Sequence, residues 1–239
     1  MKMKNASKKP KVVVSKNGPY LVSGNLPLEK EIIISDEEGH SIQWKKGEKF
    51  PRKENYALCR CGHSSNLPYC DGTHQKIGFD GTETASRKNY ISEAGKLEGP
   101  DLRLTDLEEL CSSMRFCHNK KGDTWGLTEK SDDSDAKEEA IQQACNCASG
   151  RLVAWDKKTG KPIEPKFEKS ASLIEDPETQ SSGPIWLKGG VELEGADGFK
   201  YEKRNRVTLC RCGRSRNKPF CDASHIEAGF TDGDKSIRK

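Results

Sequence analysis

Two stretches of the sequence carry the same set of sulfur and nitrogen donors at the same spacing. The shared pattern is C-x-C-x8-C-x3-H, with a proline and an aromatic residue just before the third cysteine. The donors are Cys59, Cys61, Cys70 and His74 in the first copy, and Cys210, Cys212, Cys221 and His225 in the second. Three thiolates and one imidazole suit an iron–sulfur cluster or a zinc ion, and few other groups. The pattern therefore predicts two metal centres.

The spacing within each copy suggests how the donors meet. The two cysteines of the C-x-C step share a short turn, and Gly62 follows them, so the backbone can bend closely around a cofactor. Cys70 and His74 are four residues apart and would share a face on one helical turn. Asp71 would then accept backbone N–H groups in the first turn, as would its counterpart in the second copy. We interpret this aspartate as a support for the ligands rather than a ligand.

The motif residues resemble those of the CDGSH iron–sulfur family, the mitoNEET-like proteins. This family binds a [2Fe–2S] cluster through three cysteines and one histidine. The first copy ends in CDGTH and the second in CDASH, so both keep every ligand, and Ala223 stands where the family has glycine. The resemblance covers about sixteen residues in each copy. It implies two [2Fe–2S] clusters on the eight donors given above, in the form of the family that carries two motifs in one chain.

A structural zinc protein that mediates interactions is the alternative, because zinc accepts the same donors. Zinc sites more often combine two wider cysteine or histidine pairs, so the tight C-x-C step favours iron. Replacing one thiolate by a neutral imidazole leaves the cluster less negative, which raises its reduction potential above that of an all-cysteine site. The histidine must be neutral to ligate, so acid competes with iron for its nitrogen. One-electron transfer, redox sensing and cluster donation all suit such a site, and no catalytic residue is predicted.

Four more cysteines lie between the two motifs: Cys111, Cys117, Cys145 and Cys147. The spacing of the first two, followed by C-A-S-G-R-L from position 147, resembles a divergent single-cluster ferredoxin domain, which would imply a third iron–sulfur cluster. Ala148 stands where ferredoxins usually have proline, and the first pair is wider than C-x2-C. We therefore interpret the segment as a small αβ domain with buried free thiols, with the third cluster as the alternative.

Short β-branched and aromatic runs around the motifs predict strands of small antiparallel sheets. These runs are residues 12–14, 20–22, 32–34 and 185–187. The stretch NGPYLVSG before the first motif is repeated as SGPIWLKG before the second. Each unit is thus predicted to be a β-cap with a cluster-binding loop and one short helix.

These observations predict an α+β fold in which two small antiparallel units flank a central αβ insertion. The expected parts are a disordered basic tail (1–11), an N-terminal unit (12–97), the insertion (98–180) and a C-terminal unit (181–239). Within the insertion we expect a capped helix from Thr105, a helix through residues 140–144 and an extended connector over 156–183.

Composition limits the class of protein. Hydrophobic residues make up 32% and the mean hydropathy is −0.87, so we expect bound cofactors to help hold the fold. The Lys-rich start lacks the apolar core of a signal peptide, and no run could span a membrane. We therefore expect a cytoplasmic protein without membrane contact, whose cysteines bind metal instead of forming disulfides. The net charge of +4, from 41 basic and 37 acidic residues, does not indicate nucleic-acid binding.

The expected partner is a redox protein or an apo-protein that accepts a cluster, with the chain acting as an internally pseudosymmetric monomer or a homodimer. Four basic residues gather around the second motif: Arg211, Arg214, Arg216 and Lys218. They either compensate an anionic cluster or form a docking rim for an acidic partner. His63 lies within the first ligand loop, but an arginine takes its place in the second copy, so we interpret it as a residue that supports the ligands or faces solvent. The four tryptophans are interpreted as structural.

Overall fold

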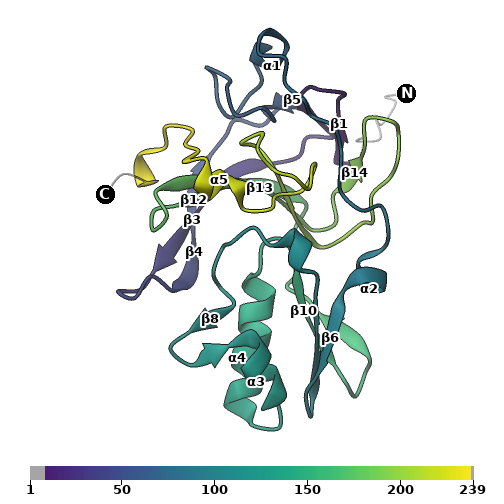
Figure 1. Ribbon diagram of the computed structural model, residues 1–239, viewed down its shortest axis with the longest axis vertical. Helices are drawn as coiled ribbons and strands as arrows, with labels where there is room; N and C mark the ends of the chain where they lie inside the picture. Colours follow the sequence, from purple (N-terminus) through teal and green to yellow (C-terminus); the bar gives the residue numbers. More distant parts are fainter. Residues whose placement is uncertain (1–8, 238–239) are drawn as a thin grey trace, which may run out of the picture.

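Strands dominate the computed structural model, which describes residues 9–237 (Figure 1). The fold is mixed α+β, as predicted, with few and short helices. The predicted basic tail lies mostly outside the described residues, and its last residue already begins the first strand, β1 (Lys11–Val14). Each of the four strand runs predicted around the motifs lies within a strand.

The first sheet has the strand order β14-β1-β2-β5. It adds β2 (Tyr20–Ser23), β5 (Asn55–Leu58) and β14 (Glu192–Glu194) to β1. The pairs β1/β2 and β2/β5 are antiparallel. In contrast, β14 runs parallel to β1, so a strand from the C-terminal part of the chain completes a sheet of the N-terminal part.

The second sheet has the strand order β15-β13-β12-β3-β4. Its strands are β3 (Leu28–Ser35), β4 (Ser41–Lys49), β12 (Ser170–Asp176), β13 (Ser181–Lys188) and β15 (Arg206–Leu209). Here β12 pairs antiparallel with β13 and parallel with β3. A strand of the N-terminal part therefore extends the sheet of the C-terminal part.

The two sheets are built alike and exchange one strand each. The order β14-β1-β2-β5 corresponds to β3-β12-β13-β15, and in both the first-named strand crosses over from the other half of the chain. The predicted β-caps are thus interleaved. The expected connector over 156–183 instead contains β11 (Lys161–Ile163) and β12. Six of the seven residues of β12 are buried, because the strand lies inside the sheet rather than at its edge.

A smaller αβ segment lies between the two motif-bearing regions and forms the lower, teal part of Figure 1. Its sheet has the order β11-β10-β7-β6, with β6 (Gly95–Glu98), β7 (Leu102–Asp106) and β10 (Leu152–Asp156). Two helices pack on it, α3 (Thr124–Glu129) and α4 (Ser134–Asn146), and Asp133 caps α4. Helix α4 confirms the helix predicted through residues 140–144. Short elements complete the segment: α2 (Tyr90–Glu93), β8 (His118–Asn119) and β9 (Gly122–Asp123).

The capped helix expected from Thr105 is wrong. Thr105 is fully buried in β7, opposite Val153 of β10, and only one 3₁₀ turn, Glu108–Leu110, follows. Asp106 does not cap a helix, because its carboxylate accepts two hydrogen bonds from the Arg151 guanidinium. Sheet pairing and this ion pair override the local helix signal.

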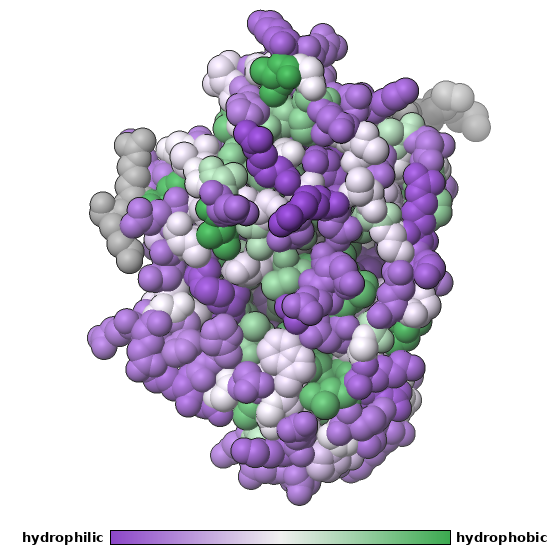
Figure 2. Space-filling model, in the orientation of Figure 1, coloured by the Kyte–Doolittle hydropathy of each residue, from purple (hydrophilic) through white to green (hydrophobic). Residues whose placement is uncertain are grey.

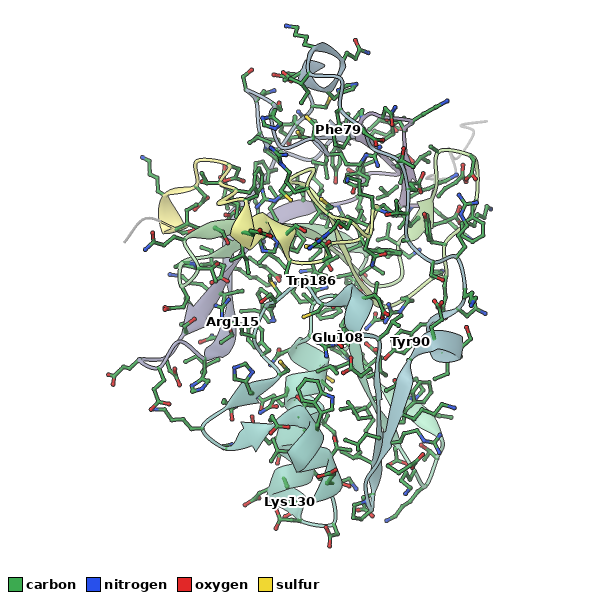
Figure 3. All side chains as sticks on the ribbon, in the orientation of Figure 1. Phe79, Tyr90, Glu108, Arg115, Lys130 and Trp186 are labelled. Carbon is green, nitrogen blue, oxygen red and sulfur yellow. The ribbon has the colours of Figure 1, made fainter. Side chains whose placement is uncertain are left out.

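The largest hydrophobic core joins both sheets, with residues from each such as Tyr20, Leu58, Leu173 and Leu209. A second cluster connects the central segment to the second sheet. In it Trp186 packs with Met114 and Phe116, and Trp44 stacks on Phe116 with ring centres 4.6 Å apart. Figure 3 shows Trp186 above the central segment at this junction. Both tryptophans are structural in this arrangement, as predicted.

The visible face is largely hydrophilic (Figure 2). Among the described residues, the large apolar side chains that stay exposed are Leu21, Ile42, Ile77 and Ile91. Across residues 9–237, every helix is too short or too polar to cross a membrane.

Candidate metal centres

Each ligand loop is closed by two backbone hydrogen bonds at the end of a strand. In the first copy the Cys59 N–H donates to Pro68 O over 2.8 Å, and the Cys70 N–H donates to Ala57 O over 3.0 Å. The second copy repeats both bonds, at 2.9 and 3.0 Å, after β15. The strands β5 and β15 therefore fix where the first and third cysteines of each motif stand.

The donor atoms of each motif fall into two close pairs. Cys59 Sγ lies 3.7 Å from Cys61 Sγ, and Cys70 Sγ lies 3.4 Å from His74 Nδ1. The equivalent distances in the second motif are again 3.7 and 3.4 Å. Two thiolates on one tetrahedral metal, each at about 2.3 Å, would be about 3.8 Å apart, and a thiolate and an imidazole about 3.5 Å. Each pair therefore has the spacing of two ligands on one metal ion.

The third cysteine and the histidine do not meet on one helical turn, which corrects the expected geometry. Helix α1 spans Thr73–Lys76, so Cys70 precedes it, and Gly72 stands between them in the left-handed conformation with φ 89°. Helix α5 (Ser224–Glu227) follows Ala223 in the same way, with φ 68°. A sharp turn before each helix brings the two donors together.

The motif aspartates hold this turn. Asp71 accepts hydrogen bonds from the Ser65 N–H at 2.8 Å and from the Thr73 N–H, at the start of α1, at 3.0 Å. Asp222 accepts the equivalent bonds from Arg216 and Ser224. Bonds from Ser65 and Thr73 hold the pKa of Asp71 well below its usual range. The predicted supporting role of this aspartate agrees with these contacts.

The arginine inside each C-R-C step is buried and holds the backbone just before β2 in the first copy and within β13 in the second. Arg60 donates from Nε to Gly18 O at 2.7 Å, and Arg211 donates from Nε to Gly183 O at 2.6 Å. Arg211 also pairs with Glu175 and Asp232. It therefore cannot belong to a docking rim, whereas Arg214 and Arg216 of the same loop are exposed.

The glycines after the C-x-C steps bring the two loops against each other. A Cβ atom at Gly62 would lie 2.6 Å from Cys212 O, and a Cβ atom at Gly213 would lie 2.6 Å from Cys61 O. Both glycines have positive φ. The close approach expected toward a cofactor is thus an approach between the two motifs, which lie side by side.

The two sites differ in exposure. In the first motif Cys70 and His74 are half-buried, whereas all four donors of the second are buried. Burial and the Arg211 charge lower the pKa of His225 to about 4, and its Nε2 has no hydrogen-bond partner in the described structure. His63 is exposed, which agrees with its interpretation as a solvent-facing residue.

Burial also disfavours the ionised form of cysteine thiols in the two motifs. This affects which groups the two sites can bind. Burial raises the pKa of Cys61 to about 11 and that of Cys221 well above its usual range. The hydrogen bond with Cys212 lowers the pKa of Cys210 to about 6, but at Cys61 and Cys221 a thiolate forms only when a positive group offsets the cost of burying charge. All ten cysteines are free thiols, so none is used in a disulfide. Soft, closely paired and mostly buried, the donors suit an iron–sulfur group bound as thiolates and neutral imidazole.

The four central cysteines separate into three and one. Cys111, Cys117 and Cys147 line one cavity of about 140 Å³. Burial, followed by the nearby charges of the other two, raises the pKa of Cys117 to about 11. Cys145 lies elsewhere, with its thiol 3.6 Å from Ile163 O.

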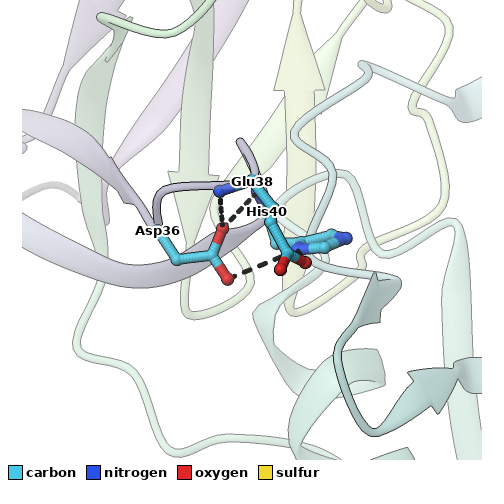
Figure 4. A group of neighbouring side chains, drawn as sticks. All are labelled: Asp36, Glu38 and His40. Carbon is cyan, nitrogen blue, oxygen red and sulfur yellow. Dashed lines mark hydrogen bonds and ion pairs between the residues drawn. The ribbon is translucent and has the colours of Figure 1, made fainter.

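One group of ionisable side chains at the surface stabilises a turn, and we do not interpret it as a metal or catalytic site. Asp36 accepts hydrogen bonds from the Glu38 and His40 N–H groups and lies 3.3 Å from the His40 ring nitrogen (Figure 4). The His40 ring also meets His118 edge to face, 5.6 Å between centres. Neither histidine had a partner visible in the sequence, because their contact depends on the packing of the central segment.

Comparison with known families gave matches over three segments. Residues 17–75 and 182–226 match the family described as iron-binding zinc finger, CDGSH type. Residues 97–157 match the family described as divergent 4Fe-4S mono-cluster. No curated protein and no solved structure matches the chain. Both motif regions and the central segment thus carry sequence features of iron–sulfur proteins.

Proposed function

We propose the following function for this iron–sulfur protein, in which two CDGSH-type segments lie on either side of a divergent 4Fe–4S mono-cluster segment. Each CDGSH motif holds one [2Fe–2S] cluster, and the protein works in one-electron transfer or in redox-linked cluster transfer. It is a carrier of electrons or clusters rather than an enzyme. Its partner is a redox protein or an apo-protein that accepts a cluster.

The observation that carries this proposal is the arrangement of donors in two separate pairs. A single tetrahedral zinc would bring all four donors within about 3.8 Å of one another. Among the described residues, no three donor atoms of either motif lie within 4.8 Å of one another, although each pair does. Each pair has the spacing of two ligands on one metal ion. Two separate pairs therefore favour a bound group that contains two metal ions.

The surrounding residues suit the exchange of electrons. A bound cluster supplies the redox change, and the protein keeps the donors fixed. Arg60 lies buried behind the first loop and places positive charge beside it, whereas Arg211 behind the second loop is paired with Glu175 and Asp232. The neutral histidine in each set reduces the negative charge, which makes accepting an electron less costly. Because the loops are held by strands on both sides, little rearrangement is needed when the charge changes.

Metal and acid-labile sulfide analysis of anaerobically purified protein tests the proposal. The two motifs should contribute about four iron and four sulfide by [2Fe–2S] stoichiometry. Cys59→Ser and Cys210→Ser should each remove about half of that contribution, and the absorbance that reports it. Stoichiometric zinc, with no visible absorbance, would instead establish the structural zinc alternative.

A further inference from the structure

A cavity larger than the central cavity of the three cysteines lies beside the second motif. Its volume is about 600 Å³, within the range of sites that bind small organic molecules. One wall comes from Leu107 and Leu110, and another from the stretch 84–93, which includes Tyr90 of α2 (Figure 3). The second ligand loop contributes Phe220, the residue just before the donor Cys221. A molecule bound in this cavity would therefore lie against the second motif.

Apolar and aromatic side chains form about half of the cavity lining. Tyr90, Tyr201 and Phe220 line it from three different stretches of the chain. The rings of Tyr201 and Phe220 meet edge to face, with centres 5.3 Å apart. The Tyr90 hydroxyl lies within hydrogen-bond distance of Thr105 O and Arg151 O, at 2.9 and 2.8 Å. These contacts hold the rings in place, and aromatic walls favour a ligand with a flat ring system.

One cation of the lining, Arg204, forms no ion pair among the described residues. It is half-buried, its guanidinium lies over the Tyr90 ring at 4.1 Å from the ring centre, and it donates to Gly150 O. Within residues 9–237, every other buried or half-buried arginine pairs with a carboxylate or, like Arg60, donates to three backbone carbonyls. Burial lowers the pKa of Arg204, so an anion beside it would stabilise its charged form. Its remaining N–H groups can bind an anion in the cavity.

The other charged side chains of the lining limit how much negative charge a ligand can carry. Arg87 pairs with Asp197 at 2.8 Å, and Lys88 lies 3.9 Å from Glu93. The lining holds three basic and three acidic residues: Arg87, Lys88, Arg204, Glu93, Glu109 and Glu202. Its formal charge is therefore zero. A ligand with one negative charge can pair with Arg204, whereas the carboxylates would repel a second.

We propose that this cavity binds a small planar aromatic monoanion, with a carboxylate on Arg204 and a ring system against the three aromatic side chains. A guanidinium offers two parallel N–H groups to a carboxylate, which orients the ligand as well as binding it. Burial of the ring faces against the apolar walls supplies the rest of the affinity. The inference goes beyond the proposed function, because none of the lining residues is one of the eight metal donors.

Three naphthalene derivatives of similar shape test the proposal: 2-naphthoate, 2-naphthamide and 2-naphthyl phosphate. Ligand-observed NMR titrations give their dissociation constants for the full-length protein at pH 8. We expect 2-naphthoate to bind at least tenfold tighter than the neutral amide. It should also bind several-fold tighter than the phosphate, which carries about two charges at this pH. Equal affinity of acid and amide would overturn the proposal, and tightest binding of the phosphate would overturn the choice of a monoanion.

Two arginines of the lining provide a matched pair of variants. Arg204→Gln should weaken binding of 2-naphthoate at least tenfold and leave that of 2-naphthamide within twofold. Arg87→Gln removes the same charge from the same cavity, but from a side chain already paired with Asp197, so either affinity should change less than twofold. Equal losses in both variants would show a general effect of charge and overturn the assignment of Arg204.

An exposed position of the lining keeps the test decisive if Arg204→Gln does not fold. The Glu109 side chain is exposed, and its backbone carbonyl, which a substitution keeps, accepts the bond from Asn217. Glu109→Gln should tighten binding of 2-naphthyl phosphate at least threefold, and that of 2-naphthoate less, because one repelling carboxylate is removed. Unchanged affinities for both anions would place them outside the cavity and overturn the proposal.

Metal analysis of the same samples separates this site from the proposed function. Protein loaded with iron and sulfide that shows no preference for 2-naphthoate refutes the cavity site alone. The expected preference in protein that holds zinc instead refutes the proposed function and leaves the cavity site standing.

Discussion

At the scale of single residues, the two motifs differ at a position where the backbone is left-handed. Gly72 has φ 89° and Ala223, its equivalent, has φ 68°. Alanine in this region costs about 1 kcal/mol relative to glycine. We expect Ala223→Gly to raise the free energy of unfolding by about 1 kcal/mol and Gly72→Ala to lower it by a similar amount. A Cβ atom at Gly72 would meet nothing within 4 Å, so only the backbone is tested.

Denaturant unfolding of the cluster-loaded protein measures both effects. Opposite shifts of the midpoint at unchanged slope are expected. Equal behaviour of both variants would show that neither position is strained.

If each CDGSH motif holds its cluster as proposed, His74 and His225 are ligands, and they should set the reduction potentials of the two centres. His74→Cys replaces a neutral donor by a thiolate, so the first cluster becomes more negative and its potential should fall. His225→Cys should do the same for the second cluster. A redox titration followed by visible absorbance distinguishes the two, because each variant should move one transition and leave the other nearly unchanged. Unchanged potentials in both variants would exclude these histidines as ligands.

Glu175 links the second motif to pH. It is buried beside Arg211 and Asp232, and burial raises its pKa from 4.5 to about 7 despite the arginine. A carboxyl group with a raised pKa in the folded state binds its proton more tightly there than in the unfolded chain. The stability it contributes is therefore present below about pH 4.5 and is lost as the pH rises through about 7.

Glu175→Gln should remove this dependence. Between pH 5 and pH 8 the free energy of unfolding of the wild type should fall relative to that of the variant. The exposed Glu227→Gln serves as the control and should follow the wild type. Parallel curves for wild type and Glu175→Gln would show that Glu175 stays ionised throughout.

At the scale of elements, the contact between the two ligand loops depends on glycine. Gly62→Ala and Gly213→Ala each place a methyl group 2.6 Å from a carbonyl oxygen of the opposite loop. Overpacking of this kind costs about 1–3 kcal/mol, in addition to about 1 kcal/mol for the positive φ. Because each glycine touches the other motif, either variant should weaken iron binding at both motifs.

The iron content of each variant after gel filtration measures this loss. Gly72→Ala serves as the control, because it changes a glycine with positive φ whose Cβ atom would meet nothing within 4 Å. Loss of iron from only the mutated motif would show that the loops are independent.

The elements also show what the sequence can and cannot predict. The predicted donors and the supporting Asp71 depend on contacts within a few residues, and the structure brings the donors of the first motif together in two pairs with Asp71 bound to the same loop. Helix α4 was predictable for the same reason, from its cap and apolar positions. The turn at Gly72 was not anticipated, because four-residue spacing does not distinguish a helical turn from a left-handed residue before a helix.

Other features depend on partners far away in the chain. Thr105 follows a helix-like pattern, but its position opposite Val153 makes it part of a strand. No local sequence feature of β12 predicts its pairing with β3, which lies about 140 residues earlier in the chain. The separation of Cys145 from its neighbour at 147 likewise follows from where α4 ends against β11. Register and helix ends, rather than residue types, decide these outcomes.

At the scale of the whole molecule, the exchanged strands tie the two motif regions into one structure. Neither sheet is complete without a strand from the other half. The central segment joins them at the second motif, where the Asn217 side chain donates to Glu109 O at 2.7 Å and Trp186 packs on Met114 and Phe116. The charge of Cys111 also contributes to raising the pKa of Cys221, after the larger effect of burial. The second centre therefore lies between the first centre and the central cavity.

From this order we expect the first centre to be the one that meets other molecules. Cys70 and His74 are half-buried, helix α1 lies at one end of the molecule, and α5 lies nearer the middle (Figure 1). Ile77, which follows α1, is 47% exposed. A site with fewer covering contacts opens at lower free energy, so its metal is released sooner. We expect a chelator to remove iron from the first centre several-fold faster than from the second.

The decay of visible absorbance in excess EDTA at fixed pH should then show a fast phase from the first centre and a slower phase from the second. Cys59→Ser, which disables the first motif, should lack the fast phase. Cys210→Ser should lack the slower phase and keep the fast one, provided that its iron content confirms an intact first centre. Ile77→Glu should leave both rates nearly unchanged, since this side chain is 47% exposed, but it should slow electron exchange with a docked protein partner. If Cys210→Ser lacks the fast phase and Cys59→Ser keeps it, the exposed, exchangeable cluster is at the second motif. The order of the two centres is then reversed.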